Sequence, residues 1–249
     1  MTIGKGTSWG YPGTLSPHSP TFRTDADLAK YLGNVLTQIP DAAASGNPTS
    51  SLDNSPSGSI PLDTTHPDSI PLNTTLLNTI PLNLVPVDNP PIGLTGGSLW
   101  RTIGGPGVVG RYATGEARHY ACDLAVAVTD GVRRVFVASL VARNQWWTKV
   151  AVVMNAQDMG AYRFGHRAHP GDALLDIYEA HIAFGDVVKV AKRARLGSHL
   201  PHPGISERRL PTVSFTFDRP RQLWLDERRV GTVKQMVVTV VPDAFTVVV

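Results

Sequence analysis

The sequence predicts a mainly β fold, a β-sandwich with one small βαβ unit attached. From residue 119 to the end, short runs rich in Val and Ala recur between turn signals, which is typical of a sandwich of antiparallel strands. Ahead of this region, a single strand–helix–strand pattern lies between residues 20 and 97. The chain has 249 residues, of which 42% are hydrophobic, so a sizeable core can form.

The βαβ unit begins with a candidate short strand at residues 20–23. Residues 24–36 predict a helix, because Thr24 can cap its N-terminus and the acidic Asp25 suits the positive end of the helix dipole. The apolar face of this helix has side chains at helical spacing: Leu28, Tyr31, Leu32 and Val35. Residues 91–97 then predict a second strand that runs into a glycine turn.

A low-complexity insertion at residues 41–91 interrupts the unit. Three decapeptide copies begin at Ser59, Ser69 and Thr79, each with Ile-Pro-Leu-Asx at the same offsets. The proline in every copy opposes helices and strand interiors alike. We therefore expect an extended or disordered insertion; the alternatives are a short β-solenoid and a segment, residues 59–88, that binds a protein partner.

The rest of the chain contains the predicted sandwich. Its expected strands are residues 119–128, 133–142, 149–155, 174–181, 210–217, 222–225, 236–241 and 244–249. One helix is predicted at residues 186–195, with its basic side chains outward and Val187, Val188, Val190 and Ala191 inward. The domain division that follows is a βαβ segment (residues 1–40 and 92–118), the insertion, and the sandwich (residues 119–249).

Charge and cysteine usage exclude several classes of protein. The net charge is +3; residues 1–100 hold three basic and seven acidic groups, whereas residues 101–249 hold 20 basic and 13 acidic groups. This basic excess is too dilute to indicate a nucleic-acid partner. The single cysteine, Cys122, cannot form an internal disulfide and fits a reducing compartment. Because no apolar run approaches the ~20 residues that span a bilayer, and no signal peptide is evident, we expect a cytoplasmic protein that at most contacts the membrane peripherally.

Two kinds of side chain stand out as candidates for ligand contact. Trp146 and Trp147 are adjacent, so strand alternation would bury one indole and leave the other at the rim. The functional alternative is that both face a lipid or another hydrophobic ligand. The His-x-x-His pairs at 166/169 and 199/202 lack a third ligand at a suitable spacing, so we expect turn histidines rather than a metal site.

Four further stretches resemble a known family in their order and spacing. They are residues 170–177 (Pro-Gly-Asp-Ala-Leu-Leu-Asp-Ile), residues 197–205 (Gly-Ser-His followed by Pro-Gly-Ile), residues 224–227 (Trp-Leu-Asp-Glu) and residues 242–249. Together they resemble the diacylglycerol kinase and sphingosine kinase superfamily of lipid kinases, which is related to the NAD kinases. The resemblance implies that residues 119–249 form the β-sandwich half of such a kinase.

The resemblance also implies site residues. Asp226 would be the general base that accepts the proton of a lipid hydroxyl, and Asp172 would correspond to a metal site. The phosphates of ATP, with Mg²⁺, would lie against the segment similar to the family's Gly-Gly-Asp-Gly-Thr turn: Gly96, Gly97, Ser98, Arg101 and Thr102. This segment departs from the family pattern, because Ser98 stands in place of the aspartate and Leu99 in place of a glycine.

These departures lead to three hypotheses about function. The first is a reduced relative of lipid kinases that binds a lipid or nucleotide with weak or no kinase activity. The second is an active ATP-dependent lipid kinase that phosphorylates a diacylglycerol-like hydroxyl. The third is a structural or partner-binding module that uses the repeat segment. Whether the chain is an enzyme stays open at this point.

Overall fold

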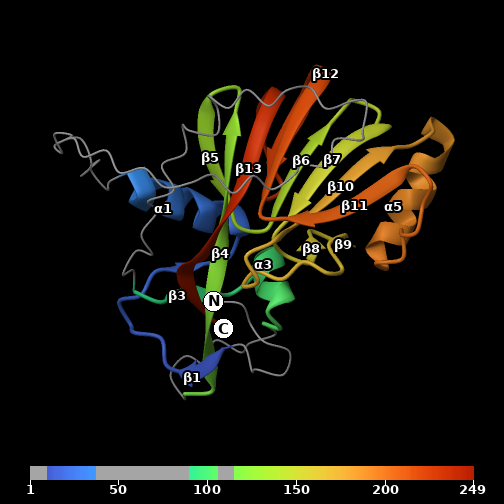
Figure 1. Cartoon of the computed structure of the whole chain (residues 1–249). Helices are drawn as coiled ribbons and strands as arrows, with labels where there is room; N and C mark the ends of the chain where they lie inside the picture. The colour runs from blue at the N-terminus through green and yellow to red at the C-terminus, as the bar shows by residue number, and fades with distance from the viewer. Residues whose placement is uncertain (1–9, 38–89, 106–114) are drawn as a thin grey trace, which may run out of the picture.

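The computed structural model describes residues 10–37, 90–105 and 115–249, and strands dominate this part of the chain (Figure 1). The helices are α1 (Asp25–Thr37), α3 (Gly97–Thr102), η1 (Phe184–Asp186) and α5 (Val187–Arg195). The strands are β1 (Tyr11–Gly13), β2 (Thr21–Phe22), β3 (Ile92–Leu94), β4 (Ala117–Thr129), β5 (Val132–Phe136), β6 (Ser139–Arg143), β7 (Lys149–Met154), β8 (Asp158–Met159), β9 (Tyr162–Arg163), β10 (Leu175–His181), β11 (Ile205–Leu210), β12 (Thr212–Leu225) and β13 (Arg228–Val248). The prediction of a mainly β fold is confirmed.

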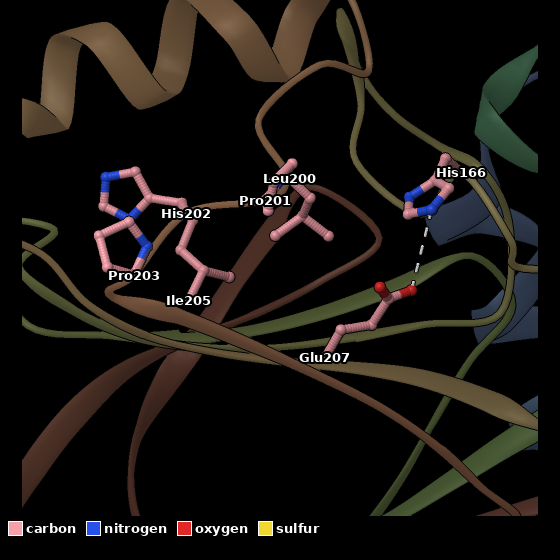
Figure 2. A pocket seen from close by; sticks show the side chains of 7 residues that line it. All are labelled: His166, Leu200, Pro201, His202, Pro203, Ile205 and Glu207. Carbon is pink, nitrogen blue, oxygen red and sulfur yellow. Dashed lines mark ion pairs between the residues drawn. The ribbon is translucent and has the colours of Figure 1, made fainter.

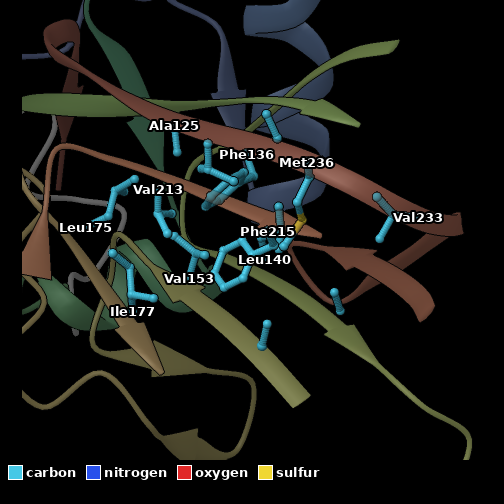
Figure 3. Close-up of a cluster of buried hydrophobic side chains, with 14 of the residues drawn as sticks. Ala125, Phe136, Leu140, Val153, Leu175, Ile177, Val213, Phe215, Val233 and Met236 are labelled. Atoms are coloured by element: carbon cyan, nitrogen blue, oxygen red, sulfur yellow. The ribbon is translucent and has the colours of Figure 1, made fainter. Parts of the chain in front are cut away.

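One sheet of eleven strands forms the body of the described structure. Its main path runs β1-β4-β13-β12-β6-β7-β10-β11, with β5 paired to β4, and β2 and β3 attached beside β13. One face of this sheet surrounds a single large apolar core (Figure 3). Side chains from both halves of the path meet there, among them Phe136, Leu140, Val153, Ile177 and Phe215. The two halves of the sheet thus pack face to face as in a sandwich, although hydrogen bonds join all of its strands into one sheet.

In two places, a pair of predicted strands forms one long strand in the structure. Residues 210–217 and 222–225 belong to β12, and residues 236–241 and 244–249 belong to β13. The register with the neighbouring strand shifts between Thr216 and Arg221 in β12, next to Pro220, and again in β13 beyond Val241. The predicted turn signals are therefore β-bulges, which bend a strand without ending it.

One predicted strand is divided in the structure. Residues 133–142 form the end of β5 and most of β6, with a break at Val137–Ala138. The backbone N–H groups of Val137, Ala138 and Ser139 all donate to the carboxyl group of Asp226. A side chain 87 to 89 residues away thus satisfies the amides that leave the ladder at this point.

The predicted βαβ unit is present. Strands β2 and β3 are parallel neighbours, and β3 also pairs in parallel with the end of β13. Helix α1 begins where expected, with the N–H of Asp27 donating to Oγ1 of Thr24 at 3.2 Å. Its predicted apolar face is packed in a second core, where Leu28 and Leu32 are buried. The repeats and most of the insertion at 41–91 lie outside the described residues, so the domain division stays a prediction.

Helix α5 covers the opposite face of β7 and β10. Its buried side chains are Val190 and Ala194, at i and i+4, and Val190 packs in a third cluster that includes Tyr178. The prediction that Val188 points inward is wrong, because its side chain is 62% exposed. Helix α5 has nine residues and buries only one stripe of side chains, Val190 and Ala194, so Val188 lies on its exposed side. No helix in the described ranges is long and apolar enough to span a membrane.

Candidate functional site

One pocket of about 450 Å³ joins two of the family-like segments, residues 96–102 and 224–227, which the sequence keeps far apart. It is lined by the first turn of α1, the N-terminus of α3, the turn between β8 and β9, and the turn between β12 and β13. Its lining includes Asp25, Gly97, Arg101, Gly160, Asp226 and Glu227. Three of the predicted site residues, Gly97, Arg101 and Asp226, therefore meet at this pocket, which we call the Asp25–Asp226 pocket.

Asp226 lies at the base of the pocket, in the two-residue turn between β12 and β13. Its side chain is 6% exposed, and its carboxyl oxygens accept three backbone hydrogen bonds of 2.8 to 3.0 Å. Burial and, to a smaller extent, the nearby Asp25 raise the pKa of Asp226, the three amide donors lower it, and the net pKa is about 7. A carboxyl group with this pKa can hold or release a proton at neutral pH.

Asp25 binds the amide groups at the start of α3. Its Oδ2 accepts from the N–H of Ser98 at 2.5 Å, and its Oδ1 accepts from the N–H of Leu99 at 3.1 Å. Burial raises the pKa of Asp25, against the effect of these two hydrogen bonds. Gly97 has φ +98°, and a Cβ atom there would clash with the Asp25 carboxyl group. The glycine is needed for this close approach of side chain and backbone.

The remaining predicted nucleotide-side residues hold the pocket wall together. The hydroxyl of Ser98 donates to Oε1 of Glu227 at 3.1 Å and accepts from the N–H of Gly160 at 3.1 Å. The guanidinium of Arg101 donates to the carbonyl of Gly160 at 2.7 Å. Thr102 accepts from the N–H of Gln157 at 2.9 Å. Gly96 is the extended residue that precedes α3 and does not line the pocket.

Charges of both signs face the pocket. The pocket is lined by three residues with carboxyl groups (Asp25, Asp226 and Glu227) and by three with guanidinium groups (Arg23, Arg101 and Arg228). Guanidinium groups suit phosphate oxygens, so the basic side chains of this pocket can attract an anionic ligand.

Asp172 lies apart from this pocket. Its carboxylate forms an ion pair with Arg209, whose Nε also binds Oδ1 of Asp176 at 2.7 Å. Within the ranges that the structure describes, no group of three or more His, Cys, Asp or Glu side chains is arranged to hold a metal ion. The residues around Asp172 thus fit an internal ion pair rather than a metal centre, and its metal role stays a prediction.

The side chains of the two His-x-x-His pairs lie in different surroundings. His166 and His202 line a second, more open pocket of about 700 Å³ and lie at opposite ends of it (Figure 2). His166 is 4.0 Å from the carboxylate of Glu207. His199 is fully buried, with its ring stacked on Phe164 at 4.3 Å.

Trp146 and Trp147 lie together in the turn between β6 and β7, away from the Asp25–Asp226 pocket. Their side chains are 60% and 41% exposed, so the expectation that one would be buried is wrong. The alternation of a strand does not apply here, because residues 144–148 form a turn and Trp147 has φ +59°. The guanidinium of Arg143 lies 4.1 Å from the centre of the Trp147 ring.

Sequence reasoning did not place Asp25, Glu227 or Gly160 in the site. Asp25 was interpreted only as a favourable charge at the start of a helix. The available signal was its position directly after the first strand of a βαβ unit, where a helix N-terminus opens onto the sheet edge. Gly160 carried no signal, because its loop reaches the pocket only through the fold.

Comparisons with known proteins concern the fold. No protein-family model matches the chain, and the search of curated proteins gives no match. A solved diacylglycerol kinase from Bacillus anthracis str. Sterne is 16% identical, with a TM-score of 0.47 over 64% of this chain and 66% of that one. Two structures from the same organism, described as candidate diacylglycerol kinases, are 12% and 15% identical, with TM-scores of 0.49 and 0.47.

The matched part spans about two thirds of each of these chains: 69% and 71% of the latter two, against 64% and 67% of this chain. The likeness is one of fold.

Proposed function

We propose that this chain is a reduced relative of diacylglycerol kinase-type lipid kinases, which binds a phosphate-bearing lipid or nucleotide in the Asp25–Asp226 pocket with weak or no phosphoryl transfer. The observation that carries the proposal is the position of the Asp25 carboxyl group. It accepts from the N–H groups of Ser98 and Leu99 at the start of α3. In the family pattern that residues 96–102 resemble, this turn faces the phosphates of ATP.

The Asp25 carboxyl group occupies the amides at the start of α3, and this should weaken phosphoryl transfer more than it weakens ligand binding. Phosphoryl transfer depends on preorganised donors and cations around the transferred group. Here two backbone donors are already satisfied within the chain, and a carboxylate at that place would repel phosphate oxygens. Arg23, Arg101 and Arg228 still line the pocket, so attraction for an anionic ligand remains.

Calorimetric titration with Mg²⁺-ATP, and separately with a soluble short-chain phosphatidic acid, tests the binding. We expect one of these ligands to bind the wild-type chain, and Arg101→Ala to weaken that binding about tenfold or more, through loss of charge-assisted hydrogen bonds. Arg133→Ala is the matched control, because Arg133 is exposed on β5 and does not line the pocket. If neither ligand binds the wild-type chain, the proposal is excluded.

Transfer is measured with labelled ATP and a short-chain diacylglycerol. We expect turnover far below the roughly 1–100 s⁻¹ that is typical of kinases. Asp25→Asn should strengthen binding of the phosphate ligand, because it removes the negative charge from the turn. A wild-type rate in the ordinary kinase range would show that the Asp25 contact does not suppress catalysis.

An active ATP-dependent lipid kinase, with Mg²⁺-ATP as substrate, is the second candidate. The pKa of Asp226, raised to about 7 by burial, favours it, because such a carboxylate can accept the proton of an attacking hydroxyl. Under this hypothesis, Asp226→Asn lowers turnover by about 10²- to 10⁴-fold. Equal turnover in the wild type and the variant would remove Asp226 from the reaction.

A further inference from the structure

Large apolar side chains are exposed where the β6–β7 turn meets the start of α5. Trp146 is 60% exposed, Phe184 is 68% exposed and Val188 is 62% exposed. The rings of Trp146 and Phe184 lie edge to face, with their centres 5.8 Å apart. The N–H of Ile182 donates to the carbonyl of Thr148 at 2.8 Å and so joins the two segments. The three side chains thus come from two segments that the fold holds together.

The turn that carries Trp146 is held in place by its own hydrogen bonds. The side chain of Asn144 accepts from the N–H of Thr148 at 3.0 Å and donates to its hydroxyl at 2.7 Å. The N–H of Trp147 also donates to the carbonyl of Asn144. The indole of Trp146 is therefore presented to solvent by an ordered turn. Its exposure contributes little to folding, because exposed apolar surface stabilises no core.

Helix α5, which begins beside this apolar group, is rich in cations. Helix α5 carries four basic and no acidic side chains over its nine residues: Lys189, Lys192, Arg193 and Arg195. They are exposed, while Val190 and Ala194 hold the helix on the sheet. Figure 1 shows α5 at the periphery of the molecule, beside β10 and β11, where a large flat partner can reach it. We define the aromatic–basic surface as Trp146, Phe184, Val188, Lys189 and Lys192.

We infer that the aromatic–basic surface docks on a lipid bilayer that contains anionic phospholipids. The amphipathic ring of Trp is favoured at the level of the headgroups, and a Phe ring beside it can insert into the apolar boundary below them. Basic side chains beside them complement the negative potential of an anionic leaflet. The occupant is identified by this combination of protruding aromatic rings and the positive charge of α5, of which Lys189 is paired with Asp186 at the start of the helix. The inference goes beyond the proposed ligand pocket and does not depend on it.

Co-sedimentation of the full chain with vesicles tests the inference. We expect binding to vesicles of phosphatidylcholine with phosphatidylglycerol, weaker binding to phosphatidylcholine alone, and a loss of binding in high salt. The double variant Trp146→Ala/Phe184→Ala should lower the partition coefficient about tenfold or more, because the inserted apolar area is lost. Lys192→Glu should lower binding only to the anionic vesicles.

The matched controls lie on β5. Val132 and Arg133 are also exposed, so Val132→Ala and Arg133→Glu make the same kinds of change elsewhere on the surface. Both should bind vesicles as the wild type does. Arg101→Ala, which tests the pocket, should leave vesicle binding unchanged and so separates the two proposals. Failure of the wild type to bind anionic vesicles would overturn the inference. So would self-association in solution that the Trp146→Ala/Phe184→Ala variant abolishes, since the surface would then bind a second copy.

Discussion

At the residue scale, Asp226 connects the sheet with the pocket. Its carboxyl group accepts the amides of Val137, Ala138 and Ser139 at the break between β5 and β6, and it also lines the Asp25–Asp226 pocket. Burial raises its pKa to about 7, far above the usual value for an aspartate. The same side chain therefore affects both the stability of the fold and the chemistry of the pocket.

This raised pKa predicts how stability changes with pH. In the unfolded chain Asp226 loses its proton near pH 4, whereas in the folded chain it keeps the proton until about pH 7. Between these values the folded state binds more protons, so the free energy of unfolding falls as pH rises from about 4 to about 7. The raised pKa values of Asp25, Asp123 and Asp176 act in the same direction.

Urea unfolding from pH 4 to pH 8 measures this dependence. Asp226→Asn should flatten it between pH 4 and pH 7, because the titrating group is gone. The variant should also be less stable at low pH, since an amide NH₂ would face a backbone donor. Asp218→Asn is the control, because Asp218 is exposed and its pKa is lowered by Lys149. A variant with the same pH slope as the wild type would show that Asp226 titrates normally.

At the scale of elements, the β12–β13 hairpin is closed by a two-residue turn. Asp226 and Glu227 form a two-residue turn with φ +45° and +66°, the left-handed conformation that favours glycine. The family motif that residues 224–227 resemble has glycine where Glu227 stands. Glu227 accepts from the hydroxyl of Ser98 at 3.1 Å, so this residue ties the hairpin to α3.

The free energy of unfolding of Glu227→Gly should be about 1 kcal/mol higher than that of Glu227→Ala, because glycine adopts the positive φ angle without strain. Glu227→Gly should also lower the pKa of Asp25, since the charge of Glu227 contributes to raising it. Glu227→Ala is the matched control, because it removes the carboxylate and keeps the Cβ atom. Chemical denaturation of the three proteins gives the comparison. A glycine variant no more stable than the alanine variant would show that the turn is unstrained.

At the scale of the whole molecule, one continuous sheet positions the site. The turn after β12 and the break after β5 meet because β12 pairs with β6 through residues 222–225. The βαβ unit is attached through β3 to the end of β13, which sets the N-terminus of α1 against the same turn. The insertion falls within the connection between α1 and β3, so both of its ends leave this one unit.

Deletion of residues 45–90 should leave this architecture intact. The deleted segment has a proline in every repeat and no amphipathic periodicity in its sequence, so we expect the free energy of unfolding to change by no more than ~1 kcal/mol. Thermal unfolding and near-ultraviolet circular dichroism of the shortened chain measure the effect. A shortened chain that is insoluble or lacks fixed tertiary structure would show that the repeats pack on the core.

Local signals in the sequence were enough to predict much of the fold. Thr24 and the spacing of Leu28 and Leu32 predicted α1 to within one residue at its start, because capping and apolar periodicity act over a few residues. Alternation of apolar side chains likewise predicted most of the strands. The glycines at 96–97 predicted a turn, and the short helix α3 that begins there was missed. Strand β11 was missed, because its sequence, Ile-Ser-Glu-Arg-Arg-Leu, has little apolar alternation.

The tertiary structure decided what depends on distant parts of the chain. Whether Pro220 ends a strand or bends it depends on the neighbouring strands, and the break after β5 depends on the Asp226 carboxyl group. The contact of Asp25 with the amides of Ser98 and Leu99 crosses 73 and 74 residues. Propensity and periodicity act over one or two turns of chain, so they determine elements. A pocket is made by hydrogen bonds and packing between elements, and only the folded sheet brings those groups together.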